Sequence, residues 1–151
     1  MMEIPLKGYS MKKALLYVAG LVVLAAAIAV SQTPAAPKHH TVFQLTEPDG
    51  PAWNIMELHV QNLKEAMDKE GGVQIEVIFF GQGLNMLRKT NTAHEAKLKH
   101  LVDMGVKLSA CQNAMKLMNI KTEDLFPFAS QVDSAVAELT RKQEAGWAYI
   151  H

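Results

Sequence analysis

The single cysteine of this sequence, Cys111, is the residue best suited to covalent chemistry. It follows the short apolar run of residues 106–110 and precedes residues 112–118, whose pattern predicts a helix. Ligands of open α/β sheets bind outside the carboxyl ends of the strands, so a thiol at a strand-to-helix junction is presented there. The free N–H groups and positive dipole end of that helix would stabilise a thiolate, the nucleophilic form of cysteine. Cysteine is also often buried as a small hydrophobic residue, so a structural role stays open.

Two other motifs give weaker signals for ligand binding. Gly81 and Gly83 separate a predicted strand from a predicted helix, where backbone N–H groups can approach an anion. The nucleotide-binding patterns G-x-G-x-x-G and G-K-[ST] are missing there, so we favour a tight turn that forms one wall of a small-ligand pocket beside Cys111. His39 and His40 could hold a metal, but no third ligand is close in sequence, and we expect solvated linker residues and no metal site.

Composition limits the number of domains and the classes of partner. The 151 residues are 49% hydrophobic and 20% charged, which suits one domain with a hydrophobic core. The 15 basic residues balance 15 acidic residues without a basic, aromatic-rich stripe, which argues against nucleic acid as a partner. One cysteine cannot form a disulfide within the chain, no cysteine or histidine spacing fits a structural zinc site, and we expect no cofactor.

The first thirty residues have the pattern of a secretory signal. Lys12 and Lys13 precede an apolar stretch at residues 14–30, and small residues and prolines follow. Cleavage after Ala29 or after Ala36 would fit the small-residue rule. The alternative is a retained membrane anchor, because about 17 apolar residues lie at the lower limit for crossing a bilayer. We therefore predict a signal peptide or N-terminal anchor at residues 1–30, a linker at residues 31–40 and one domain at residues 41–151, in the periplasm or secreted, or anchored and facing outside the cytoplasm.

From residue 41 onward, strand and helix patterns alternate along the chain. Strands are predicted at residues 41–46, 73–80, 106–111 and 128–132, and a last short strand at residues 147–150 at a sheet edge or a subunit contact. Helices are predicted from Pro51 to the glycines at 71–72, at residues 84–89, from Thr92 to Gly105, at residues 112–118 and from Ser134 to Gly146. This repetition predicts a three-layer α/β/α sandwich with a mostly parallel sheet.

Several polar residues are predicted to end or begin these helices. Thr92 and Glu95 form a capping-box pattern, Thr122 can cap a short turn, and Asn119 suits a left-handed helix end. Ser134 is predicted to cap the last helix.

Other side chains are assigned to faces by helical spacing. Val136, Leu139 and Thr140 of the last helix are expected to face inward, and His94 and His100 to lie on a solvated face.

At five places the sequence resembles the DsrE/DsrF-like family. The segment GVKLSACQNAM at residues 105–115 is similar to the cysteine region of that family, with Asn119-Ile120 and Asp124-Leu125 downstream. LTEPD at 45–49, QNL at 61–63, GQGL at 81–84 and RKQEAGWAYI at 141–150 recur in order with compatible spacing. The resemblance covers the whole predicted domain. It implies a five-stranded sheet, assembly into trimers or hexamers and, in the sulfur-relay branch, a cysteine that carries sulfur as a persulfide.

Carried onto this chain, the resemblance makes Cys111 the sulfur-carrying residue. The N–H groups of Gln112 and Asn113, with the Asn113 side chain, would stabilise charge on the sulfur, and Glu47 and Asn62 are candidates for the pocket wall. Two features depart from the family. Phe80 stands where members often have a polar residue, which makes the pocket more apolar. The sulfur-relay members work in the cytoplasm with carrier proteins, whereas this chain is predicted to be exported.

The leading hypothesis is an exported, sulfurtransferase-like sulfur carrier whose partners are a sulfur donor, an acceptor thiol and further copies of itself. The alternative is a non-enzymatic homo-oligomer that binds a small ligand, with Cys111 structural, since no histidine is obviously placed as a base. Apolar and aromatic residues expected near the surface would suit subunit contacts or complete the core: Trp147, Tyr149, Ile150, Phe126 and Phe128. A membrane is expected as a partner only if the N-terminal segment is retained.

Overall fold

The computed structural model describes residues 36–48 and 50–151. The predicted signal peptide or anchor at residues 1–30 and the first half of the predicted linker lie outside the described residues. Within the described part, none of the helices combines the length and the apolar character needed to cross a membrane.

Five strands form one sheet, and every neighbouring pair of strands is parallel. The order is β4-β3-β2-β1-β5, so β2 is central and β4 and β5 are the edges. The predicted five-stranded sheet and the edge position of the last strand are confirmed. The strands are β1 His39–Leu45, β2 Val73–Phe79, β3 Lys107–Cys111, β4 Ser130–Val132 and β5 Ala148–Ile150.

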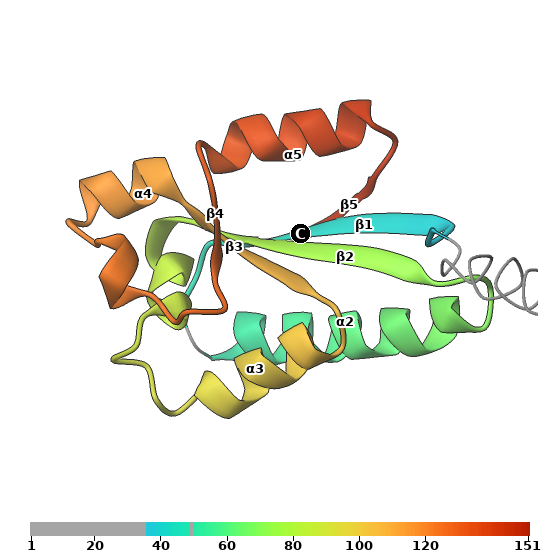
Figure 1. The fold of residues 1–151 in the computed structure, drawn as a ribbon, viewed down its shortest axis with the longest axis horizontal. Coiled ribbons are helices and arrows are strands. Elements are labelled where there is room, and N and C mark those ends of the chain that lie inside the picture. Colours follow the sequence, from blue (N-terminus) through green and yellow to red (C-terminus); the bar gives the residue numbers. More distant parts are fainter. Residues whose placement is uncertain (1–35, 49) are drawn as a thin grey trace, which may run out of the picture. The chain divides into compact units, whose positions relative to one another are not determined.

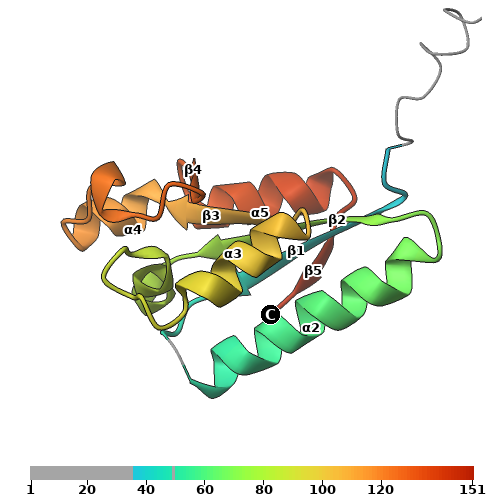
Figure 2. The same ribbon diagram turned by 60° about the horizontal axis from the view of Figure 1, so that its bottom comes forward.

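Helices cover both faces of the sheet, with α2 and α3 on one side and α4 and α5 on the other (Figures 1 and 2). This is the three-layer α/β/α sandwich that the alternating pattern predicts. The helices are α2 Pro51–Asp68, α3 Glu95–Asp103, α4 Gln112–Leu117 and α5 Ala135–Glu144, with 3₁₀ segments η1 Gly81–Leu87 and η2 Thr122–Asp124.

The core is centred on β2. Val77, Ile78 and Phe79 are fully buried because helices cover both faces of this strand. Trp53 of α2 and Leu98 of α3 are also fully buried. The strand predicted at residues 73–80 is therefore the central strand of the sheet.

The first strand begins two residues earlier than predicted. His39 and His40 pair with Val73 and Gln74 of β2, so they do not belong to the predicted solvated linker. The His39 N–H donates to the Gly72 carbonyl (3.2 Å), and the His40 ring lies 5.2 Å from the Trp147 ring. Backbone pairing and ring packing thus extend the strand beyond its apolar segment.

The inward face of α5 differs from the prediction by about one residue. Ala135 and Leu139 are buried, whereas Val136 is 66% exposed and the exposed Thr140 donates its hydroxyl to the Val136 carbonyl (2.9 Å). One residue turns a helix by about 100°, so this shift moves both side chains off the sheet. The predicted cap is confirmed, because the Ser134 hydroxyl accepts from the Ala137 N–H (3.5 Å).

The capping box predicted before α3 does not form. The helix begins at Glu95 after His94, without a side-chain cap, and the Thr92 carbonyl accepts the Glu95 N–H (3.4 Å). His100 is exposed as predicted. His94 is half-buried instead, because its ring packs edge-on against Trp53 with centroids 5.8 Å apart.

The turn at η2 is also capped differently from the prediction. The Asp124 carboxylate accepts from the Lys121 N–H (2.8 Å), whereas the Thr122 hydroxyl accepts from Nε2 of Gln131 (3.0 Å). Asn119 does adopt the predicted left-handed conformation, with φ 51°.

Three of the aromatic residues expected near the surface lie deeper than that. Phe126 is buried and stacks on half-buried Phe128 with centroids 5.1 Å apart. Trp147 is half-buried beneath Lys142, whose Nζ lies 3.8 Å from the ring centroid. Tyr149 is exposed at the sheet edge.

Candidate functional site

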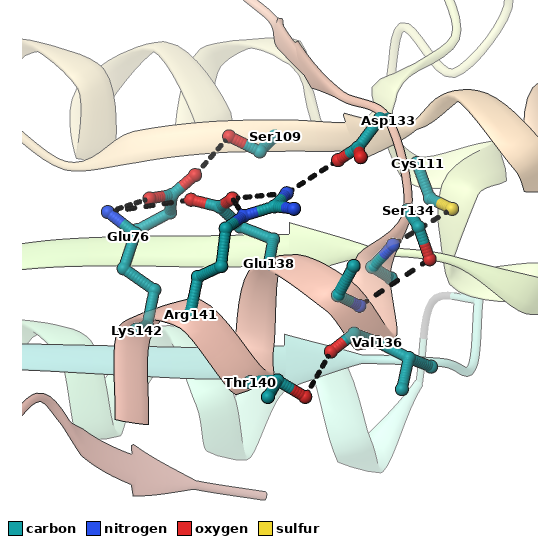
Figure 3. Close-up of polar contacts among 12 residues, drawn as sticks. Glu76, Ser109, Cys111, Asp133, Ser134, Val136, Glu138, Thr140, Arg141 and Lys142 are labelled. Atoms are coloured by element: carbon teal, nitrogen blue, oxygen red, sulfur yellow. Dashed lines mark hydrogen bonds and ion pairs between the residues drawn. The ribbon is translucent and has the colours of Figure 1, made fainter. Parts of the chain in front are cut away.

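Cys111 is the last residue of β3 and the N-cap residue of α4. Its side chain does not cap α4. Instead, Sγ accepts a hydrogen bond from the backbone N–H of Ala135, the first residue of α5, at 3.2 Å (Figure 3). The helix that supports the sulfur is therefore α5, and the expected bonds from the N–H groups of Gln112 and Asn113 are replaced by this one.

The sheet brings α5 to the cysteine. In the parallel ladder Cys111 is the register partner of Val132, so the chain leaves β4 at the level of the thiol. Asp133 and Ser134 then lead directly into α5 at Ala135. A helix N-terminus carries free N–H groups and partial positive charge, which favour negative charge on an adjacent sulfur.

Ion pairs of Arg141 stabilise the start of α5. The Arg141 guanidinium donates to Asp133 (2.6 Å) and to Glu138 (2.9 Å), and so links the residue before the cap to the body of the helix (Figure 3). The hydrogen bond from Arg141 lowers the pKa of the Asp133 carboxyl below its ordinary value and raises the pKa of Arg141. Asp133 is exposed, so solvent limits the energy of this pair.

Cys111 lines a pocket of about 380 Å³ between η1, α4 and the start of α5. Cys111 itself is only 5% exposed. Among the described residues, those lining this pocket include no charged side chain and no histidine. Its lining residues are Phe80, Gly81, Gln82, Cys111, Asn113, Ala114, Leu117, Met118, Ser134, Ala135 and Val136.

Three of the predicted site residues lie near Cys111. Gly81 and Asn113 line its pocket. Gln112 follows it directly, but its amide donates to Oε1 of Gln131 (3.3 Å), and Gln112 is not a lining residue.

Gly83 has a close contact with β1. Its N–H donates to the Thr46 carbonyl (2.8 Å), and an added Cβ would lie 2.3 Å from the Leu45 carbonyl oxygen. Gly83 therefore lets η1 approach β1, and η1 begins at Gly81, earlier than the predicted helix at residues 84–89.

Glu47 and Asn62 lie apart from this pocket. Glu47 lines a second pocket of about 320 Å³ between β1, α2 and the end of β5, together with His59 and Ile150. Asn62 is exposed on α2 and lines neither pocket. The structure thus separates Glu47 and Asn62 from the Cys111 pocket and from each other.

A buried carboxylate lies under α5 on the cysteine side of the sheet. Glu76 of β2 is 1% exposed; Oε1 accepts from the Ser109 hydroxyl (2.6 Å) and lies 3.0 Å from Lys107 Nζ. Oε2 lies 2.8 Å from Nζ of Lys142 on α5 (Figure 3). Burial raises the pKa of Glu76, but bonds from Lys142, Ser109 and Lys107 outweigh it, so its pKa is lowered. This cluster ties α5 to the sheet and is not visible from sequence spacing.

The described part of the chain holds no group of three or more histidine, cysteine, aspartate or glutamate side chains that could bind a metal ion.

Comparisons with known proteins agree with the fold. The model of the DsrE/DsrF-like family matches residues 38–151. No curated protein matches the chain. A similar solved structure is MTH1491, a protein of unknown function from Methanobacterium thermoautotrophicum, with 29% identity, a TM-score of 0.65, and coverage of 75% of this chain and 98% of that one. Another is BT1422, a conserved protein of unknown function from Bacteroides thetaiotaomicron, with 14% identity, a TM-score of 0.60, and coverage of 77% and 97%.

Proposed function

The chain belongs to the DsrE/DsrF-like family, which includes sulfur-relay proteins, and from this premise we propose that it carries sulfane sulfur as a persulfide on Cys111. The observation that carries the proposal is the 3.2 Å hydrogen bond from the Ala135 N–H to Sγ, inside a pocket large enough for a small donor. A thiolate is the attacking form of cysteine, and a donor at a helix N-terminus favours it.

The transfer proceeds as two thiol exchanges. The Cys111 thiolate attacks the outer sulfur of a persulfide R–S–SH, a new S–S bond forms, and the S–S bond of the donor breaks. The donor leaves as the thiolate R–S⁻ with the bonding electron pair, and Cys111 holds S–SH. An acceptor thiolate then attacks the outer sulfur, restores the Cys111 thiolate and carries the sulfur away, so neither an oxidant nor a metal is required.

The walls of the pocket favour an uncharged or apolar donor. Phe80, Leu117 and Val136 contribute apolar surface, and the lining described above holds no cation that would pair with a thiosulfate-like dianion. Gln82 and Asn113 supply amide groups at the same pocket for a polar part of the donor. Phe80, the position at which the sequence departs from the family, thus contributes directly to donor selection.

We also propose that the protein is exported and acts outside the cytoplasm, on the pattern of residues 1–30. Its carrier partners would then be thiols of that compartment. The mass of the protein recovered from the natural host decides between cleavage after Ala29, cleavage after Ala36 and a retained anchor.

Mass spectrometry tests the sulfur-carrier proposal. The purified full chain is incubated with a small apolar persulfide, and we expect a mass gain of one sulfur atom, located on Cys111 and removed by a reducing thiol. Cys111→Ser is the matched control. No gain on the wild type, or an equal gain on Cys111→Ser, would falsify the proposal.

The burial of Cys111 supports a second candidate, a non-enzymatic small-ligand-binding protein in which the thiol only packs. Alkylation separates the two candidates. Reaction of Cys111 with iodoacetamide in the native state favours sulfur transfer, whereas protection until the chain unfolds favours the binding protein.

A further inference from the structure

A third pocket, of about 260 Å³, lies beside η1 and shares no lining residue with the Cys111 pocket or the Glu47 pocket. Its volume suits a small ion or one end of a larger ligand. The lining residues are Pro48, Asn85, Met86, Arg88, Thr90 and Asn91.

The arginine of this pocket is held in place by its backbone. The Arg88 N–H donates to the Asn85 carbonyl (3.3 Å), and Arg88 forms an antiparallel bridge with Leu125. The Arg88 carbonyl accepts from the Asn91 N–H (2.8 Å), which closes a turn around Thr90. The guanidinium therefore projects from a fixed main chain.

The guanidinium of Arg88 has no protein acceptor within the described residues. Its Nε is buried and makes no hydrogen bond, and none of the ion pairs between described residues includes Arg88. Arg141, the other arginine of the chain, pairs with both Asp133 and Glu138. An unpaired buried donor on a charged group is unfavourable, so an acceptor from solution would be stabilised there.

The described residues that line this pocket with Arg88 supply further donors and no carboxylate. The Asn85 amide donates to Oε1 of Gln82 (3.0 Å), and the Asn91 amide donates to the Met86 carbonyl (3.4 Å). The Asn85 amide nitrogen carries a second N–H, whereas the Asn91 amide nitrogen also donates to Met86 Sδ (3.5 Å). The described lining contains no carboxylate to compete for the guanidinium.

We propose that this pocket binds a small oxyanion group, a carboxylate or a phosphate, through the guanidinium of Arg88. The planar fork of an arginine matches two oxygens of either group. The Asn85 amide and the Thr90 hydroxyl supply neutral donors around it. This site does not depend on the reactivity of Cys111.

The Nε–H signals in a nitrogen-15 NMR spectrum test the proposal directly. The chain has two arginines, so two such signals are expected, and Arg88→Lys assigns them by loss of one. The full chain is titrated separately with sodium acetate and sodium phosphate, with sodium chloride holding the ionic strength constant. We expect the Arg88 signal to shift and saturate, while the Arg141 signal stays unchanged as an internal control.

The acetate and phosphate titrations distinguish the possible ligands. Saturation with acetate alone identifies a carboxylate site, with phosphate alone a phosphate site, and with both a general oxyanion site. A signal that does not saturate with either anion, or that moves together with that of Arg141, overturns the proposal.

A variant locates the site independently. In Arg88→Lys, the backbone amide signals of Thr90 and Asn91 report binding, and we expect affinity to fall by about tenfold because the fork is lost while the charge is kept. Unchanged affinity in this variant would also overturn the proposal.

Discussion

At the scale of single residues, the bond from the Ala135 N–H to Cys111 Sγ connects the fold to the chemistry most directly. The donor belongs to the first turn of α5, where N–H groups have no partner inside the helix. The sulfur accepts from one of these N–H groups, and the Ser134 hydroxyl accepts from another, that of Ala137.

Ala135→Pro removes this donor and places the proline Cδ where the amide hydrogen pointed, so the Cys111 side chain must also turn away from α5. Proline fits the first position of a helix, and Ser134 before it already has the extended conformation that proline requires (φ −144°, ψ 129°). Loss of one hydrogen bond to a charged sulfur predicts about a tenfold slower transfer of sulfur from a persulfide donor. Rapid-quench mass spectrometry measures the rate.

Ala135→Gly is the control, since it keeps the N–H and should transfer sulfur at nearly the wild-type rate. A proline variant that is folded and as fast as the wild type would show that the bond plays no part in the reaction.

Also at the residue scale, Glu76 makes the stability of the folded protein depend on pH. Its pKa is lowered in the folded protein from an ordinary value of 4.5. A lowered carboxyl pKa contributes stability that is fully present above the unfolded value and is lost as the pH falls through the folded value. The contribution is therefore complete at neutral pH and declines below 4.5.

Glu76→Gln should lower the free energy of unfolding by about 3 kcal/mol at neutral pH, because Lys142 and Lys107 lose a buried charged partner. The difference from the wild type should shrink in acid, where the wild-type carboxyl is protonated as well. Urea unfolding across the pH range measures this difference.

Asp103→Asn, which breaks an exposed pair with Lys99, is the control and should cost less than about 0.5 kcal/mol. A deficit that stays constant with pH would contradict this account.

At the scale of elements, α5 is held in place at both ends. Its start is held by Ser134 and by the pair of Arg141 with Asp133, and its last turns by the ion pair of Lys142 with Glu76. Lys142 also lies over the Trp147 ring, beyond the end of the helix. The position of the Ala135 N–H over the thiol therefore depends on contacts along the whole helix.

The turn at η1 depends on the absence of a side chain at Gly83. In Gly83→Ala the new Cβ would collide with the Leu45 backbone, so we expect a loss of about 2 kcal/mol of stability, measured by thermal or urea unfolding. Gly105→Ala is a useful comparison: nothing lies within 4 Å of its Cβ position, and its φ of 86° alone should cost about 1 kcal/mol. Equal losses in the two variants would contradict the close-contact explanation.

Periodicity predicts the strands, the layers and the strand-to-helix position of Cys111, because each depends on local pattern. The donor Ala135 and the cluster around Glu76 could not be predicted, because they depend on the order of strands in the sheet. The place of β4 beside β3 brings Val132 level with Cys111, and no short-range signal specifies that pairing. The inward face of α5 was missed because Val136 is as apolar as Leu139, although it is exposed.

At the scale of the whole molecule, apolar side chains remain exposed at the edge of the sheet that ends in β5. Ile55 on α2 is 53% exposed and lines the Glu47 pocket, which includes Ile150 of β5. Leu58 and Tyr149 are also exposed. We propose this region as the contact of a closed homo-oligomer, a trimer or a pair of trimers.

Ile55→Glu should then shift the protein toward a monomer, because a buried unpaired carboxylate opposes association. Sedimentation velocity of the full chain at micromolar concentration measures the mass. Lys99→Glu, an exposed charge change on α3, should leave the assembly intact. A wild-type monomer, or an Ile55→Glu variant of unchanged mass, would rule out this contact.

The group that donates to the cysteine sulfur is the main-chain N–H of Ala135, and this affects how similar sites can be found in other proteins. A main-chain N–H is supplied by any amino acid except proline. The identity of residue 135 therefore does not record that its N–H donates to the Cys111 sulfur. A saturation mutagenesis of this codon would record a preference for small side chains, because Ala135 is 2% exposed, and this preference reports packing and not the N–H. Sequence alignments compare residue identities, so they do not detect such a donor. Distances from a thiol to the first turn of a neighbouring helix would recognise it in proteins of unrelated sequence.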